Sequence, residues 1–385
     1  MSTSPERCLG DLMKDIEKED SPREDDSKDE TAYKTSAELV LSLDSLYSLQ
    51  SSTSSQLEDL MKNPKINCYS KAEIFLAFNT LKTTLVLQNC LTNSTKEERD
   101  HIIKELSGSF SQIIKNKNGN YYCKDFFKNC DKEQINIILN ELKETISDDC
   151  IDEFGSHPIQ TLVELINSEE EYKLFLSSFS DPEKILRASL NLNGSYVVQK
   201  IFVHIPEKYR MEFNINFAKF ILILSVNMYG VCTVKKFIGY TKNDILIKQT
   251  LNIIISNFVN ICQNKYGNYL IQYLLEYWWK TKEGVPLKKI CISKFTTLAM
   301  SHYSSYICGL YITLSNQEEK KCLISSITKE KAYDTLKSDS IGNIILNKLL
   351  SALKTSKDES KKEEKKFIPL SLNNIRPIFR PKKKE

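Results

Sequence analysis

Pairs of side chains four residues apart recur eight times along the chain, and in six of the pairs both members can form hydrogen bonds. The pairs are Thr84 and Gln88, Asn120 and Lys124, Ser156 and Gln160, Ser195 and Gln199, Val231 and Lys235, Asn268 and Gln272, Ser305 and Gly309, and Asn343 and Asn347. Amide and hydroxyl groups bind the polar edges of nucleic-acid bases. The recurrence therefore points to a surface that contacts bases one after another.

A third residue directly follows the first member of each pair, and five of the eight are aromatic or histidine. They are Leu85, Tyr121, His157, Tyr196, Cys232, Tyr269, Tyr306 and Ile344. Flat rings beside hydrogen-bonding side chains provide stacking surfaces for the bases of a single strand. The sequence thus predicts base-edge contacts and stacking in each unit.

Each pair lies in a short phrase that begins at a glycine in six of the eight copies. The starting residues are Thr83, Gly119, Gly155, Gly194, Gly230, Gly267, Ser304 and Gly342. We call this starting residue the glycine slot and count it as position zero. The paired side chains then occupy the first and fifth positions, and the third residue, often a ring, occupies the second position. Neighbouring copies are 36 to 39 residues apart, which is the period of a helical-repeat protein.

Apolar residues occupy the third, fourth, seventh and eighth positions of a phrase, as Val197, Val198, Ile201 and Phe202 do in the fourth copy. This spacing predicts one buried face of an α-helix, with the paired side chains on the opposite face. A further apolar segment precedes each phrase, such as 221–226 before Gly230 or 251–259 before Gly267, giving two or more helices per unit. Short helices of this kind bury their apolar faces by stacking, so we expect an all-α solenoid.

The phrases Gly267-Asn-Tyr-Leu-Ile-Gln272 and Gly194-Ser-Tyr-Val-Val-Gln199 resemble those of the Pumilio (PUF) family. The resemblance implies a crescent-shaped α-solenoid of eight Pumilio-type repeats over residues 57–354. It also implies a concave face that binds single-stranded RNA antiparallel, with the last repeat at the 5′ end. In that family Asn with Gln recognises uracil, and Ser or Cys with Gln recognises adenine. The sixth phrase is then expected to bind U, and the third and fourth each an A.

Other phrases depart from the family pattern. Gly309 stands where the family's guanine-recognising repeat has Glu, Asn347 replaces Gln, and Lys124 and Lys235 occupy the fifth position of the second and fifth phrases. The two lysines are expected to contact a phosphate or a base carbonyl. The expected RNA site is N-N-U-N-A-A-N-N.

The residues expected to contact RNA form the following set. They are Thr84, Gln88, Asn120, Tyr121, Lys124, Ser156, His157, Gln160, Ser195, Tyr196, Gln199, Lys235, Asn268, Tyr269, Gln272, Ser305, Tyr306, Asn343 and Asn347. An alternative role for five of them is helix N-capping, because small polar side chains near a helix start often accept backbone N–H bonds. Those five are Asn120, Ser156, Ser195, Asn268 and Ser305.

Charge divides the chain into three parts. Residues 1–36 carry 11 acidic and 6 basic side chains, and residues 355–385 carry 5 acidic and 10 basic ones, within a net charge of +3. We expect residues 1–56 to be a disordered, acidic and Ser-rich segment, 57–354 the repeat domain with a capping half-repeat at about 57–70, and 355–385 a basic-ended tail. The balanced middle argues against binding dominated by phosphate attraction.

Several function classes find no support in the sequence. It has no apolar stretch of signal-peptide or membrane-spanning length, no Cys-x-x-Cys pair, no metal-ligand spacing among its four histidines and no Gly-rich phosphate loop. We expect a cytoplasmic, monomeric, non-enzymatic protein without cofactor, metal or membrane contact, with nuclear or nucleolar residence as the alternative. Its expected partners are mRNA and effector proteins held by the N-terminal segment or the convex face.

The expected function is binding to mRNA 3′-untranslated regions for repression or decay. One alternative is a nucleolar Pumilio-like protein that binds ribosomal RNA with low selectivity. A second, from a different class, is a protein-binding scaffold of the HEAT or armadillo kind.

Overall fold

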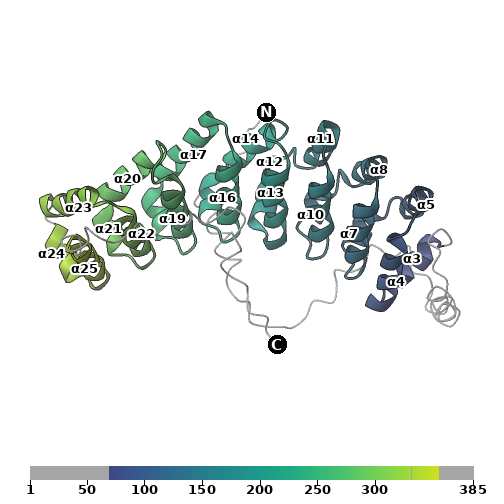
Figure 1. Cartoon of the computed structure of the whole chain (residues 1–385), viewed down its shortest axis with the longest axis horizontal. Helices are drawn as coiled ribbons and strands as arrows, with labels where there is room; N and C mark the ends of the chain where they lie inside the picture. The colour runs from purple at the N-terminus through teal and green to yellow at the C-terminus, as the bar shows by residue number, and fades with distance from the viewer. Residues whose placement is uncertain (1–68, 331, 355–385) are drawn as a thin grey trace, which may run out of the picture. The chain divides into compact units, whose positions relative to one another are not determined.

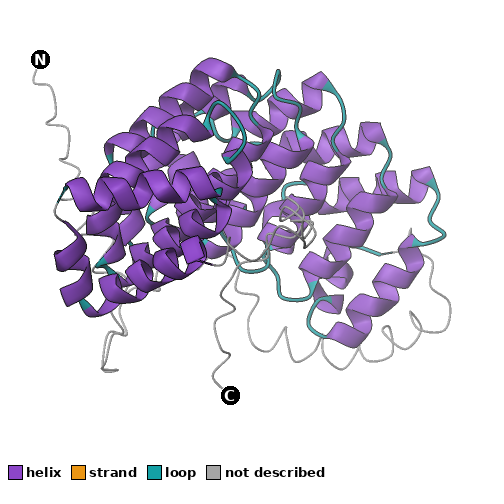
Figure 2. Cartoon of the chain, turned by 60° about the vertical axis from the view of Figure 1, so that its left-hand side comes forward, coloured by secondary structure: helices purple, strands orange, loops and turns teal. Residues whose placement is uncertain are grey.

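The computed structural model describes residues 69–330 and 332–354, which belong to one unit. These residues form only helices and connecting loops (Figure 2). The segment expected at 1–56, residues 57–68 of the expected capping half-repeat and the tail 355–385 lie outside them.

Eight helices contain the phrases, and we call them the phrase helices. They are α4 (Leu81–Leu91), α7 (Gly119–Asn129), α10 (Ser156–Leu165), α13 (Leu192–His204), α16 (Gly230–Tyr240), α19 (Gly267–Trp278), α22 (His302–Leu314) and α25 (Ser340–Lys354). Each phrase helix packs on the next one in this order, so that they follow one another along the unit from α4 to α25 (Figure 1). The phrases therefore form one continuous row.

A short helix precedes each phrase helix and packs against it, and we call these the leading helices. They are α3 (Lys71–Ala77), α6 (Phe110–Ile114), α9 (Ile146–Asp149), α12 (Pro182–Leu190), α15 (Ile221–Ser225), α18 (Phe258–Gln263), α21 (Phe295–Ala299) and α24 (Ala332–Ser338). The apolar segment at 221–226 supplies such a helix, whereas the segment at 251–259 lies mostly in the helix before α18 and reaches only the first two residues of α18.

A third set, the outer helices, follows the phrase helices in the chain. They are α5 (Lys96–Leu106), α8 (Lys132–Leu142), α11 (Glu169–Ser177), α14 (Met211–Ala218), α17 (Asp244–Ser256), α20 (Gly284–Ser293) and α23 (Gln317–Lys329). A typical unit thus has three helices, within the expectation of two or more. The all-helical solenoid expected from the sequence is confirmed.

The core explains why the units stack. Phe202 of α13 contacts Phe213 and Phe217 of α14 and Phe237 of α16, with ring centroids 5.7, 4.9 and 5.6 Å apart. All four rings are buried. Because one ring completes its contacts on the next phrase helix, no unit buries its apolar face alone.

Within residues 69–330 and 332–354, no helix has both the length and the apolar character needed to cross a bilayer.

Candidate nucleic-acid interface

An Asn or Asp three residues before the glycine slot starts six of the phrase helices. Its side-chain oxygen accepts the backbone N–H groups two and three residues later, at 2.7–3.1 Å. These residues are Asn116, Asp152, Asn191, Asn227, Asn264 and Asp339. Thr80 accepts the Thr83 N–H at 3.2 Å in the first phrase. Such contacts satisfy N–H groups that the helix leaves unpaired. The repeated Asn/Asp-x-x-Gly pattern was visible in the sequence but missed.

The glycine slot is a point of close approach between a phrase helix and its leading helix. A Cβ on Gly194 or Gly230 would lie 2.6 or 2.5 Å from the carbonyl oxygen six residues earlier, so only glycine fits without a backbone shift. In the two phrases without glycine, the Thr83 and Ser304 hydroxyls donate to the carbonyl at this same offset, at 2.5 and 2.7 Å. The slot therefore holds the following residues at a fixed distance from the leading helix.

The first-position side chains do not lie on an exposed face opposite the apolar stripe, and that part of the prediction is wrong. Seven are buried, and Asn343 is half-buried. The buried ones are Thr84, Asn120, Ser156, Ser195, Val231, Asn268 and Ser305. The reason is that Cα–Cβ bonds tilt toward the N-terminus of a helix, which here abuts the leading helix.

The N-capping alternative is also contradicted where these side chains bond, because they donate to carbonyls instead of accepting N–H groups. Asn268 Nδ2 donates to the carbonyls of Asn264 and Lys265 at 2.9 and 3.0 Å. Asn120 repeats this geometry, and Ser195 Oγ donates to the Leu192 carbonyl at 2.9 Å. Backbone contacts thereby restrict these groups to one orientation.

Apart from Lys235, which is buried, the fifth-position side chains are more accessible, and they remain one helical turn from their partners. Gln88, Lys124, Gln160, Gln199 and Gln272 are half-buried, and Asn347 is exposed. Gln272 Nε2 donates to Asn268 Oδ1 at 2.9 Å, and in the eighth phrase Asn347 Nδ2 donates to Asn343 Oδ1 at 3.2 Å. The structure thus brings the first and fifth positions together, as the spacing predicts.

The second-position side chains form the most exposed part of the phrase helices. Tyr121, His157 and Tyr306 are exposed, as are the apolar Leu85 and Ile344, whereas Tyr196, Tyr269 and Cys232 are half-buried. Burial, aided by the charge of Lys124, lowers the pKa of His157, which keeps this ring neutral at pH 7. Five of the eight second positions therefore present a ring to the surface of the phrase helices.

Three fifth-position residues contact the sixth position of the following phrase, which sequence reasoning did not anticipate. Gln88 Nε2 donates to Asp125 Oδ2 at 2.6 Å. Lys235 Nζ lies 5.6 Å from the centre of the Tyr273 ring, and burial lowers its pKa. Lys348 Nζ donates to the Gly309 carbonyl at 3.0 Å. These contacts occur in the first, fifth and seventh phrases, which have Leu85 in place of a ring, Lys235 in place of Gln and Gly309 in place of Glu.

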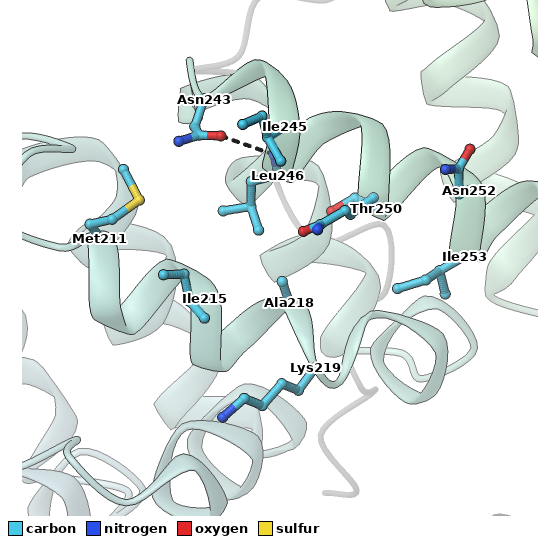
Figure 3. A pocket seen from close by; sticks show the side chains of 11 residues that line it. Met211, Ile215, Ala218, Lys219, Asn243, Ile245, Leu246, Thr250, Asn252 and Ile253 are labelled. Carbon is cyan, nitrogen blue, oxygen red and sulfur yellow. Dashed lines mark hydrogen bonds between the residues drawn. The ribbon is translucent and has the colours of Figure 1, made fainter.

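A hollow of about 560 Å³ lies between the phrase helices α22 and α25. A groove of about 680 Å³ lies between the outer helices α14 and α17, where Ile215 and Ile245 are 50% and 69% exposed (Figure 3). In the part of the chain that the structure describes, no group of three His, Cys, Asp or Glu side chains is placed to hold a metal ion.

Comparison with known proteins supports this architecture. A family model described as a Pumilio-family RNA binding repeat matches residues 85–107, 109–143, 185–212 and 257–278. Pumilio homolog 12 of Arabidopsis thaliana is 22% identical over 74% of this chain and 53% of its own length. A Pumilio domain-containing protein of Schizosaccharomyces pombe is 21% identical over 69% of this chain and 38% of its own. The chain spans about half the length of the curated relatives it matches, or less.

Solved structures share the fold. The Puf4 RNA binding domain bound to the HO endonuclease RNA 3′ UTR recognition sequence has a TM-score of 0.64 at 17% identity, covering 72% of this chain and 86% of its own. PUF-8 in complex with PBE-RNA has a TM-score of 0.64 at 19% identity, covering 80% of this chain and 88% of its own. The family model and the curated relatives support a Pumilio-family protein, and the solved structures show that the row of phrase helices has the same fold.

Proposed function

We propose that the phrase helices bind single-stranded RNA, with base edges hydrogen-bonded to first- and fifth-position side chains and bases stacked on second-position rings. The observation that carries this proposal is the Asn268, Tyr269 and Gln272 set of α19. Its three side chains lie within one turn, the amides are in contact, and the ring between them is partly accessible. Family members solved with RNA share the fold.

The chemistry of this set favours uracil. Both Nδ2 hydrogens of Asn268 point to backbone carbonyls, so that its Oδ1 is left to accept. Gln272 Nε2 donates to this Oδ1, so that a donor group lies directly beside the acceptor. An acceptor next to a donor complements the N3–H group and a neighbouring carbonyl of uracil. We therefore assign U to the third base of the site.

Adenine suits the fourth phrase for a related reason. The Ser195 hydroxyl hydrogen is used on the Leu192 carbonyl, which leaves the oxygen as an acceptor. The half-buried amide of Gln199 offers both a donor and an acceptor, the combination that binds adenine N7 and N6. Ser156 and Gln160 repeat these residue types in the third phrase. Adjacent adenines at the fifth and sixth bases follow.

For the biological role we propose binding to mRNA 3′-untranslated regions, leading to repression or decay. Its support is that the structurally similar Puf4 domain is bound to a 3′ UTR recognition sequence. The contacts that restrain Gln88 and Lys235 favour the second candidate, binding to ribosomal RNA with low selectivity. The triplets of α10, α13 and α19, which have the expected residue types, favour the first.

Selection of bound sequences from a random RNA pool by the full chain separates these functions. Enrichment of N-N-U-N-A-A-N-N supports selective binding, binding without an enriched motif supports the ribosomal candidate, and absence of RNA binding contradicts both. Asn268→Ala with Gln272→Ala is expected to weaken binding to the enriched RNA by about 1 to 3 kcal/mol and to abolish preference at the third base alone. Gln249→Ala with Asn252→Ala, an exposed amide pair on the outer helix α17, is the matched control and is expected to change neither.

Effector proteins are expected to bind away from the phrase helices. The groove between α14 and α17 offers exposed Ile215 and Ile245, with Lys219 as the only charged side chain in its lining (Figure 3). Ile215→Asp with Ile245→Asp is expected to leave RNA affinity unchanged while reducing repression of a reporter mRNA. Unchanged repression would exclude this groove as the effector site.

A further inference from the structure

The hollow between α22 and α25 exists because the seventh phrase has no side chain at its fifth position. It is lined by Ser305, Tyr306, Gly309, Ile344 and Lys348 among others, which places it on the face that carries the first- and second-position residues. A Cβ added to Gly309 would approach only one neighbouring atom within 4 Å, Lys348 Nζ at 3.1 Å. Next to Gly309, the space that a Gln side chain occupies in other phrases therefore holds only the end of the Lys348 side chain.

Lys348 brings a charged group to this space from the following phrase. Its Nζ donates to the Gly309 carbonyl at 3.0 Å, which holds the ammonium beside the missing side chain. An ammonium has three donor hydrogens, so that two remain for a ligand. In the part of the chain that the structure describes, no carboxylate pairs with Lys348.

Two other pairs of successive phrases have a similar contact, in which a sixth-position side chain touches the fifth-position residue of the preceding phrase. We call such a place a junction. Asp125 holds the amide of Gln88, and the Tyr273 ring lies against the ammonium of Lys235. In those junctions the sixth-position residue restrains a side chain that is already present. At Gly309 there is none, and the sixth-position residue itself enters the site.

We propose that Lys348 recognises the base held by the seventh phrase, and that this base is guanine; the inference rests on the RNA binding proposed above. An ammonium can only donate, and guanine presents two adjacent acceptors, O6 and N7, on one edge. Cytosine O2 and N3 form a similar pair of acceptors, but on a smaller ring that fills less of the hollow. Adenine places an N6–H donor next to N7 and repels the charge. The exposed Tyr306 ring and Ile344, 58% and 67% exposed, supply surfaces on which a purine stacks.

The test measures affinities of the full chain for four RNAs, N-X-U-N-A-A-N-N with X equal to G, A, U or C, and for a fifth with 7-deazaguanine at X. The wild type is expected to bind the G-containing RNA about tenfold more tightly than the other three, and to lose much of that preference when N7 is removed. Lys348→Met keeps most of the aliphatic stem and removes the charge, and is expected to bind all four within about twofold.

Lys200→Met is the matched control. Lys200 occupies the sixth position of the fourth phrase, but its ammonium pairs with Glu164 instead of a fifth-position residue. This variant is expected to keep the preference for G at X. The helical circular dichroism spectrum of each variant shows whether it is folded.

Equal affinity of the wild type for all four bases at X, with selectivity for U and A retained at the other positions, would overturn the inference and leave the proposed function standing. An equal loss for every X in Lys348→Met would also overturn it, because it would reveal a phosphate contact. Absence of selectivity at every position would reject the proposed function and this inference together.

Discussion

Replacing Gly194 by alanine tests whether the glycine slot positions the recognition residues. The new Cβ would lie 2.6 Å from the Ala188 carbonyl oxygen, 2.9 Å from Ala188 Cα and 3.0 Å from Ile151 Cγ2. Two of these neighbours are backbone atoms of the leading helix α12, which cannot turn away as a side-chain end does. The start of α13, and Ser195 with it, must therefore move.

The expected change in the free energy of unfolding results from two opposing effects of the substitution. Inserting a methyl group into a packed site costs about 1 to 3 kcal/mol, and contact with backbone places this substitution at the upper end. Alanine in place of glycine within a helix recovers about 1 kcal/mol. Gly194→Ala is therefore expected to destabilise the domain by about 2 kcal/mol and to weaken selectivity for A at the fifth base.

Urea unfolding followed by circular dichroism measures the change in stability, with Gly309→Ala as the matched control. Gly309 lies inside α22, and an added Cβ there meets only the flexible end of Lys348. This control is expected to stabilise the domain by about 0.5 to 1 kcal/mol. Equal stability of Gly194→Ala and the wild type, or equal destabilisation by both substitutions, would refute the argument from close approach.

Three further predictions concern the supports of the phrase helices. Asn264→Ala removes the acceptor for two N–H groups at the start of α19 and should cost about 1 kcal/mol in urea unfolding. Arg210→Met leaves two carbonyls, to which the buried guanidinium donates, without a donor, and is expected to lower the free energy of unfolding by about 3 kcal/mol or more. A smaller loss would show that water replaces these bonds. The pKa of His157 lies below its ordinary 6.5. Its contribution to stability is therefore complete above pH 6.5 and lost as the pH falls through the folded pKa, so that wild type and His157→Gln should diverge only in the acidic range.

Periodic local patterns predicted much of this protein. The buried faces of the phrase helices follow from apolar spacing along one helix, as at Val197, Val198, Ile201 and Phe202, all of which are buried. The contact between Asn268 and Gln272 follows equally from a separation of four residues on a helix. Asn264 and its equivalents were also predictable, because an Asn or Asp before glycine at a helix start is a local signal.

The exposure of the recognition residues was not predictable in this way. The period of one helix assigns Asn268 and Gln272 to the same face, yet Asn268 is 2% exposed while Gln272 remains partly accessible. The difference arises because the leading helix covers the start of each phrase helix. Its position depends on the close approach at the glycine slot, which is a contact between two helices.

The sequence by itself determined the repeat period, the helical class and the identity of the paired side chains, because these depend on residues within a few positions of each other. Only the tertiary structure decided which fifth-position residues contact a side chain of the following phrase. Lys348 and Gly309 are 39 residues apart, and Gln88 and Asp125 are 37 apart. Such pairs meet only when successive phrase helices pack in register, a geometry set jointly by the core rings, the glycine slots and the capped helix starts.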